Sequence, residues 1–179
     1  YARWTATYRI YTVTLDGNGG TPSQSSSSFY YNEALGTLPT VTRTGYTFKG
    51  WSTSANGPVN VSTTTKVTGD VTYYAIWQIN SYTLTVTAGT GGTVSGSGTY
   101  NYGATATLKA TPSAGYHFVK WSDGNTNASR TVTVTGNATY TATFEQDPYL
   151  NLDKTSLTFE AAGGTQTVKV TSNVNWTVS

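Results

Sequence analysis

The chain has 179 residues, of which only 10% are charged, and its formal net charge at pH 7 is +2. The sequence contains no basic patch, so nucleic acid is a poor candidate partner, and the absence of Cys excludes a disulfide framework and a thiolate metal site. No apolar run approaches the roughly 18 residues that span a bilayer, so no membrane insertion is expected in this segment.

The chain begins with short predicted β-strands separated by polar turns. Thr is the commonest residue and Tyr is abundant; both favour strands. Strands are predicted over residues 10–15, 46–51, 61–67 and 71–77. The one segment considered for a short helix is residues 29–35, with Asn32 as a candidate cap and Gly36 ending it.

Residues 16–20 superficially resemble the opening of a calcium loop, because Asp16 and Asn18 stand two positions apart. Such a loop also needs further oxygen ligands and a Glu at its twelfth position. The twelfth position here is Ser27. Residues 16–20 are therefore interpreted as a tight turn rich in Gly and Asn, and no metal or other cofactor is predicted.

The strand within Gly45-Tyr-Thr-Phe-Lys-Gly-Trp51 poses a geometric problem. Tyr46 and Phe48 share one face, but Trp51 is an odd number of residues from Phe48, so simple alternation places it on the other face. A β-bulge at Lys49-Gly50 would return Trp51 to the core.

The same motif returns 70 residues later as Gly115-Tyr-His-Phe-Val-Lys-Trp121. The upstream segments match as well, since residues 11–15 correspond to residues 82–86. Self-similarity at a fixed period predicts tandem repeat units. In the second copy, apolar side chains alternate with Thr along each predicted strand. This pattern is typical of antiparallel strands with one buried and one wet face.

Residues 1–4 resemble residues 74–77, so they are interpreted as the last strand of a preceding repeat. Residues 147–148 break the repeat pattern and are interpreted as a linker. Beyond them, the sequence predicts four short strands, over residues 150–152, 156–160, 166–171 and 175–178. The predicted domains are a strand and link over residues 1–10, repeats over residues 11–78 and 79–146, and an incomplete domain over residues 147–179.

No catalytic site is predicted from the sequence. His117 is the only His, and the other repeat holds Thr at the same position. Asp16 and Asp123 lie in predicted turns, where Asp serves the backbone. Glu33 and Asp70 have no counterpart that would pair with them for acid–base chemistry.

The aromatic residues are either core or candidate ligand contacts. Trp51 and Trp121 could stack on sugars, but small units with few Leu need large aromatic side chains to fill their cores. Their recurrence at one repeat position also favours the core. Better candidates for exposed, ligand-binding aromatic side chains lie in segments rich in Ser, Gly and Asn. These candidates are Tyr30, Tyr31, Tyr100 and Tyr102.

The first repeat resembles the Listeria–Bacteroides repeat, also called the internalin B-repeat. This resemblance rests on Thr14-Leu-Asp-Gly-Asn-Gly-Gly20, Leu38-Pro39, the motif ending at Trp51, and Val71-Thr-Tyr-Tyr-Ala-Ile-Trp77. The second repeat is similar to a divergent form of the same family. It keeps Gly91-Gly92, Gly115-Tyr116 and Trp121, but it lacks the Leu-Pro step.

The last segment is similar to the start of a BACON domain, a Bacteroides-associated module with a sandwich fold. The matching residues are Leu157-Thr-Phe159, Ala162-Gly-Gly-Thr165 and Ser172-Asn-Val-Asn-Trp-Thr-Val-Ser179. Together, the resemblances imply a mainly β protein: tandem β-grasp-like units with at most one short helix, then a partial β-sandwich. They offer no catalytic residues.

The resemblances also imply an exported bacterial protein that is attached to the cell surface through other parts of a longer chain. The sequence hypothesis is a non-catalytic stalk or adhesion segment, whose partners are neighbouring domains of that chain. The alternative is a carbohydrate-binding module that contacts glycans or host surface proteins through exposed aromatic side chains. A row of exposed aromatics would favour the alternative, whereas buried aromatics and exposed Thr would favour the stalk.

Overall fold

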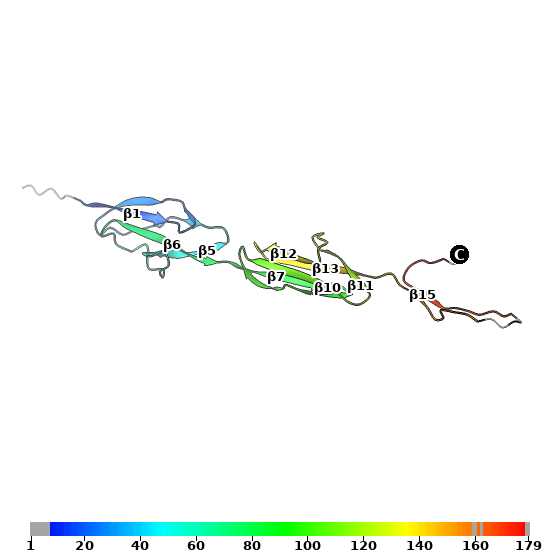
Figure 1. The fold of residues 1–179 in the computed structure, drawn as a ribbon. Helices are drawn as coiled ribbons and strands as arrows, with labels where there is room; N and C mark the ends of the chain where they lie inside the picture. Colours follow the sequence, from blue (N-terminus) through cyan, green and yellow to red (C-terminus); the bar gives the residue numbers. More distant parts are fainter. Residues whose placement is uncertain (1–7, 159–160, 162, 178–179) are drawn as a thin grey trace, which may run out of the picture. The chain divides into compact units, whose positions relative to one another are not determined.

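The computed structural model describes residues 8–158, 161 and 163–177. The strand predicted over residues 1–4 lies outside the described residues, as do the ends of the strands predicted over residues 156–160 and 175–178. The described residues form strands and turns and contain no helix (Figure 1). The expectation of a mainly β fold with at most one short helix is therefore confirmed.

The first repeat is built on a four-stranded sheet of order β3-β1-β6-β5. The strands are β1 (Ile10–Asp16), β3 (Ser26–Tyr30), β5 (Tyr46–Ser52) and β6 (Val71–Ile79). The central pair, β1 and β6, is parallel, and the outer strands pair antiparallel with it. Two short strands, β2 (Thr21–Pro22) and β4 (Val41–Thr42), form a separate antiparallel ladder.

Alternation along β1 buries Val13 and Leu15 and leaves Thr12 and Thr14 exposed. The core of this repeat combines these two side chains with residues from the later strands and loops. Its buried members are Val13, Leu15, Leu35, Val41, Trp51, Val61, Val67, Tyr73 and Ala75.

Residues 29–35 do not form the short helix that was considered from the sequence. Strand β3 continues to Tyr30, and Asn32 has a positive φ of 65°, which a right-handed helix does not allow. The backbone N–H of Leu35 donates to the carbonyl oxygen of Thr65, at 3.0 Å. Long-range backbone bonding thus holds the segment and brings Leu35 into the core.

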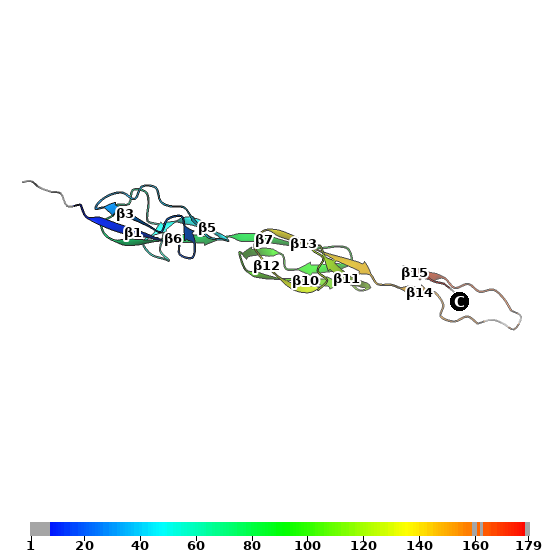
Figure 2. The same ribbon diagram turned by 90° about the horizontal axis from the view of Figure 1, so that it is seen from above.

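The second repeat contributes a four-stranded sheet of order β11-β13-β7-β9 and a three-stranded sheet of order β12-β10-β8 (Figure 2). The bounds are β7 (Ser81–Ala88), β8 (Gly92–Ser95), β9 (Gly98–Asn101), β10 (Thr105–Pro112), β11 (Tyr116–Trp121), β12 (Ser129–Thr133) and β13 (Ala138–Gln146). In β10, Ala106, Leu108 and Ala110 are buried, while the residues between them are exposed. This alternation is the one that the sequence predicts.

Both repeats contain a bulge shortly before the tryptophan of the repeated motif. In β5, the pairing with β6 shifts register between Phe48 and Gly50, and Gly50 has a φ of 143°. In β11, the pairing with β13 shifts register after Phe118. As a result, Trp51 is 1% exposed and Trp121 is 0% exposed. The predicted bulge and the predicted core role of both tryptophans are confirmed.

The described chain divides into two compact units that do not follow the repeat boundaries. The first takes in the residues up to Leu84, together with Gly98–Ala106 and Thr133–Asn137. The second takes in Thr85–Ser97, Thr107–Val132 and the residues from Ala138 onward.

Beyond residue 148, the described residues form one antiparallel ladder of β14 (Leu150–Leu152) and β15 (Val170–Ser172). Strand β14 has the predicted bounds. Of the strand predicted over residues 166–171, only the last two residues lie in a strand, β15. Residues 156–158 and 175–177 are not strands. The partial β-sandwich implied for residues 147–179 stays a prediction.

Candidate functional site

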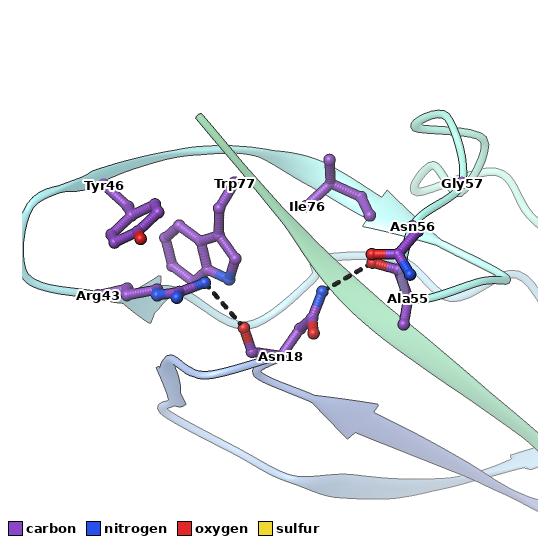
Figure 3. A pocket seen from close by; sticks show the side chains of 8 residues that line it. All are labelled: Asn18, Arg43, Tyr46, Ala55, Asn56, Gly57, Ile76 and Trp77. Atoms are coloured by element: carbon purple, nitrogen blue, oxygen red, sulfur yellow. Dashed lines mark hydrogen bonds between the residues drawn. The ribbon is translucent and has the colours of Figure 1, made fainter. Parts of the chain in front are cut away.

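The first repeat contains a pocket of about 350 Å³ that is lined by eight residues (Figure 3). They come from the turn after β1, the segment between β4 and β5, the start of β5, the loop after β5, and β6. The lining residues are Asn18, Arg43, Tyr46, Ala55, Asn56, Gly57, Ile76 and Trp77. None of these eight is acidic, so the guanidinium of Arg43 is the only formal charge in the lining.

Arg43 is held by two contacts within the lining. Its Cζ lies 3.8 Å from the centroid of the Tyr46 ring, which is within the range of a cation–π interaction. Its Nη1 donates a hydrogen bond to the carbonyl oxygen of Asn18, at 3.1 Å. Arg43 is half-buried, and it makes no ion pair with a carboxylate of the described residues.

The turn after β1 is fastened to the rest of the repeat by Asn18. The Oδ1 atom of Asp16 accepts the backbone N–H of Asn18 at 2.7 Å, as in the predicted turn. The Nδ2 atom of Asn18 donates to the carbonyl oxygens of Ala55, at 2.8 Å, and Ala75, at 3.0 Å. This bonding places the Asn18 side chain between the turn and the loop after β5 (Figure 3).

Trp77 forms an aromatic wall of the pocket. Its Nε1 donates to the carbonyl oxygen of Gly17, at 2.9 Å. Its ring packs edge-on against Phe48, with centroids 5.5 Å apart. A Cβ atom on Gly20 would overlap the Trp77 ring, so only glycine fits there without a shift. The orientation of Trp77 is thus fixed by a strand, a turn and a second aromatic ring.

The second repeat offers an internal comparison for this site. The N–H of Tyr46 donates to the carbonyl of Arg43, and the N–H of Tyr116 donates to the carbonyl of Ser113, both at 3.1 Å. Ser113 is therefore the structural counterpart of Arg43. Thr90 likewise stands where the first repeat has Asn18.

The two repeats fill the space beside the turn glycine differently. A Cβ atom on Gly91 would overlap the ring of Tyr116, so the tyrosine lies directly against the glycine. In the first repeat, a Cβ atom on Gly19 would lie 3.1 Å from the Cζ of Arg43. The arginine thus lies between Gly19 and the ring of Tyr46. The sequence analysis did not predict the pocket. Alignment of the two repeats could have drawn attention to Arg43, because the second repeat has Ser113 at the same position.

Tyr30 and Tyr31, two of the predicted ligand contacts, lie at the end of β3 and are 51% and 62% exposed. The ring of Tyr30 packs edge-on against Tyr8, with centroids 5.4 Å apart, and the ring of Tyr31 lies 6.3 Å from that of Tyr11. These side chains form two separate ring pairs, because Tyr11 packs against the core beside Phe29, whereas Tyr30 lies on the other face of β3. The role of Tyr30 and Tyr31 in ligand binding stays a prediction.

Tyr100 and Tyr102, the other two candidates, are half-buried. Tyr100 pairs with Tyr82 across the β7–β9 ladder. The ring of Tyr102 lies 6.5 Å from that of Tyr82 and also covers Gly45, where a Cβ atom would overlap it. The surroundings of Tyr102 are those of a packing residue, and the role of Tyr100 and Tyr102 in ligand binding stays a prediction.

His117 and Asp123 are not among the pocket-lining residues, whereas the carboxylate of Asp16 bonds to the lining residue Asn18. His117 Nδ1 is 2.8 Å from Asp147 Oδ1, and both side chains are about half exposed. The Nη1 of Arg130 donates to both carboxylate oxygens of Asp123, at 2.8 and 2.7 Å. This hydrogen bonding holds the pKa of Asp123 below its usual range. The arrangement at Asp123 is that of a turn fastened by an ion pair.

Two family models match the chain. Residues 11–76 match the Listeria-Bacteroides repeat domain, and residues 82–148 match the divergent InlB B-repeat domain. Such repeat domains are typical of bacterial surface proteins and are generally non-catalytic. No solved structure was found to match the chain. The described residues include no helix that is long and apolar enough to cross a membrane. The resemblance of the last segment to a BACON domain stays an expectation.

Proposed function

Because the chain carries a Listeria-Bacteroides repeat followed by a divergent InlB B-repeat, we propose that it is a stalk segment of a bacterial surface protein. Its role is to space and orient other domains of a longer chain, without catalysis. In tandem repeats, each repeat contacts mainly its neighbours. The stiffness of the connection between two repeats therefore decides how well a stalk keeps its orientation. An extracellular position, with attachment through other parts of the chain, belongs to this proposal.

The observation that carries the proposal is the bonding of Asn80, the single residue between β6 and β7. Its backbone N–H donates to the carbonyl of Gly45 at 2.9 Å, and its carbonyl accepts the N–H of Tyr102 at 2.8 Å. Its Oδ1 accepts the hydroxyl of Thr47 at 2.6 Å. These three bonds tie the connection between β6 and β7 to other residues of the first compact unit, unlike the unbonded chain of a Gly/Ser-rich linker.

The distribution of side chains also supports a spacer. Trp51 and Trp121, the two tryptophans of the repeated motif, are fully buried. The outward faces of strands such as β7 and β10 are rich in exposed Thr. A Thr surface keeps β propensity without creating the large apolar patch that marks a protein interface.

Single-molecule energy transfer tests how stiff the chain is between the two repeats. The chain has no Cys, so Ser28→Cys and Thr131→Cys, at exposed positions in the two repeats, allow one dye on each. We expect a narrow distance distribution for this protein and a broad one when four Gly/Ser residues are inserted after Asn80. Equally broad distributions in both proteins would refute the stalk proposal, because the unmodified connection would then be as flexible as the insert.

A second candidate function is glycan contact through the exposed rings of Tyr8, Tyr30 and Tyr31. Host surface proteins are alternative partners for the same three tyrosines. Binding to a broad glycan array tests this function, with Tyr30→Ala/Tyr31→Ala as the variant and Tyr100→Ala/Tyr102→Ala as the control. Selective binding that only the first variant loses would support it. No binding at high protein concentration would contradict it and leave the stalk.

A further inference from the structure

The pocket of the first repeat holds a positive charge that the described residues do not neutralise. A guanidinium presents five N–H donors and accepts no hydrogen bond. At Arg43, one of these donors is used on the carbonyl of Asn18 and the ring of Tyr46 covers one face of the group. Buried charges are ordinarily paired, because the loss of hydration is costly without a partner. Arg43 is half-buried in a lining with no carboxylate, so the pocket is suited to an anion.

A purely structural role for Arg43 is the competing explanation. The second repeat argues against a purely structural role. There, Ser113 occupies the equivalent position, and the ring of Tyr116 lies directly against the turn glycine Gly91. That repeat still forms the same bulge and buries Trp121. The fold therefore does not require an arginine between the glycine and the tyrosine, and Arg43 gives the first repeat a property that the second lacks.

The rest of the lining indicates the kind of molecule that carries the anion. Trp77 and Tyr46 offer aromatic surface, and the side chain of Asn56 is an exposed amide. Small-molecule sites combine an apolar surface with a few polar groups that fix orientation, and they have volumes of about 300–1,000 Å³. The pocket lies at the lower end of that range, at about 350 Å³, so it suits a small molecule or one end of a longer one.

We propose that this pocket binds an acidic saccharide unit, with Arg43 pairing its carboxylate or sulfate and Trp77 contacting its ring. Guanidinium groups recognise such planar or multi-oxygen anions by paired hydrogen bonds. The proposed site does not include Tyr30 or Tyr31. It is also independent of the stalk proposal, whose test measures the connection at Asn80 and not ligand binding.

Titration of the ¹⁵N-labelled full chain, followed by NMR, tests the site through the indole N–H signal of Trp77. The probes are glucuronic acid and glucose 6-sulfate, with glucose as the neutral sugar and acetate and sulfate as free anions. We expect saturable shifts with one or both acidic sugars, and weaker binding of glucose and of the free anions by about tenfold or more, a difference of 1.4 kcal/mol. The two acidic sugars distinguish a carboxylate from a sulfate.

Arg43→Gln is expected to abolish the shifts, whereas Arg130→Gln serves as the matched control. The guanidinium of Arg130 also lies over a tyrosine ring, that of Tyr140, but it is paired with Asp123. Should Arg43→Gln fail to fold, Asn56→Asp keeps every contact of Arg43 and places a carboxylate in the exposed part of the lining. That variant is expected to lose binding of the acidic sugars, while its Trp77 indole N–H signal keeps the chemical shift of the folded protein.

Three results would overturn the proposal. Equal binding of glucose and glucuronic acid would show that charge is not recognised. Binding of free acetate or sulfate as tight as that of the acidic sugars would show an anion site without a sugar site. Absence of saturable shifts with all probes at high concentration, in a protein with a dispersed Trp77 signal, would show that Arg43 is only a structural contact.

Discussion

The two core tryptophans differ in the bonding of a single atom, and this difference makes a sharp stability prediction. Trp121 Nε1 donates to the carbonyl of Asn127 at 2.9 Å. Trp51 Nε1 is buried and has no hydrogen-bond partner. The two rings are otherwise matched, because each packs against the Phe three residues earlier, with centroids 5.6 and 5.5 Å apart. Replacing each Trp by Phe thus removes similar ring area but changes the hydrogen bonding in opposite ways.

The magnitude follows from the cost of each hydrogen-bond change. Trp121→Phe loses a bond worth about 0.5–1.5 kcal/mol, while Trp51→Phe removes a buried unsatisfied donor that costs about 1–3 kcal/mol. The loss from the smaller ring is common to both variants and cancels in the comparison. We therefore expect Trp121→Phe to destabilise its unit more than Trp51→Phe destabilises its own, by about 1.5–4.5 kcal/mol.

Native-state hydrogen exchange measures the two effects separately. Protected amides of β6 report on the first compact unit and those of β13 on the second, since core strands exchange through the larger unfolding events. Trp51→Ala and Trp121→Ala provide the upper reference, at about 3–5 kcal/mol each for a core aromatic. Equal losses for the two Phe variants, or a larger loss at Trp51, would refute the reasoning from hydrogen bonding.

Two further predictions concern a turn and an ion pair. Gly20→Ala is expected to destabilise the first unit by about 2 kcal/mol or more because the new methyl overlaps the Trp77 ring. Gly69→Ala, where a Cβ atom meets nothing, should change the melting temperature little, and equal effects of both in thermal melts would contradict the steric argument. Asp123→Asn should cost at most about 1 kcal/mol at pH 7, because the ion pair with Arg130 is partly exposed. The pKa of Asp123 is lowered in the folded state, so its contribution is present above the ordinary Asp pKa of about 3.9 and is lost as the pH falls through the folded pKa. Melts from pH 7 to pH 2 check this, and a difference that grows on acidification would contradict it.

The repeat pattern carried most of the information about the cores. The odd spacing of Phe48 and Trp51 required a bulge if both were to pack inside, and β5 has that bulge. The alternation of Ala and Leu with Thr and Lys likewise predicted the buried face of β10. Both inferences succeed because the side chains of a strand alternate between its faces with a period of two residues, a property of neighbouring residues along the chain.

Predictions failed or were absent where distant segments decide the structure. Residues 29–35 have a local composition compatible with a helix, but they form the end of β3 and a turn, and the backbone bond from Leu35 to Thr65 holds the segment against a distant part of the chain. The close contact between the ring of Tyr102 and Gly45 was not predicted either. No local pattern marks such partners, since they are separated by tens of residues and meet only after the sheets form.

The sequence by itself therefore determined the number of repeats, their mainly β character and the burial of Trp51 and Trp121. Only the tertiary structure brought Arg43 between Gly19 and Tyr46 and placed Trp77 beside them. The physical reason is that burial follows from the periodic placement of apolar side chains within one strand. A pocket depends instead on which turns and strands come together, and on whether a glycine leaves room for the side chain that enters.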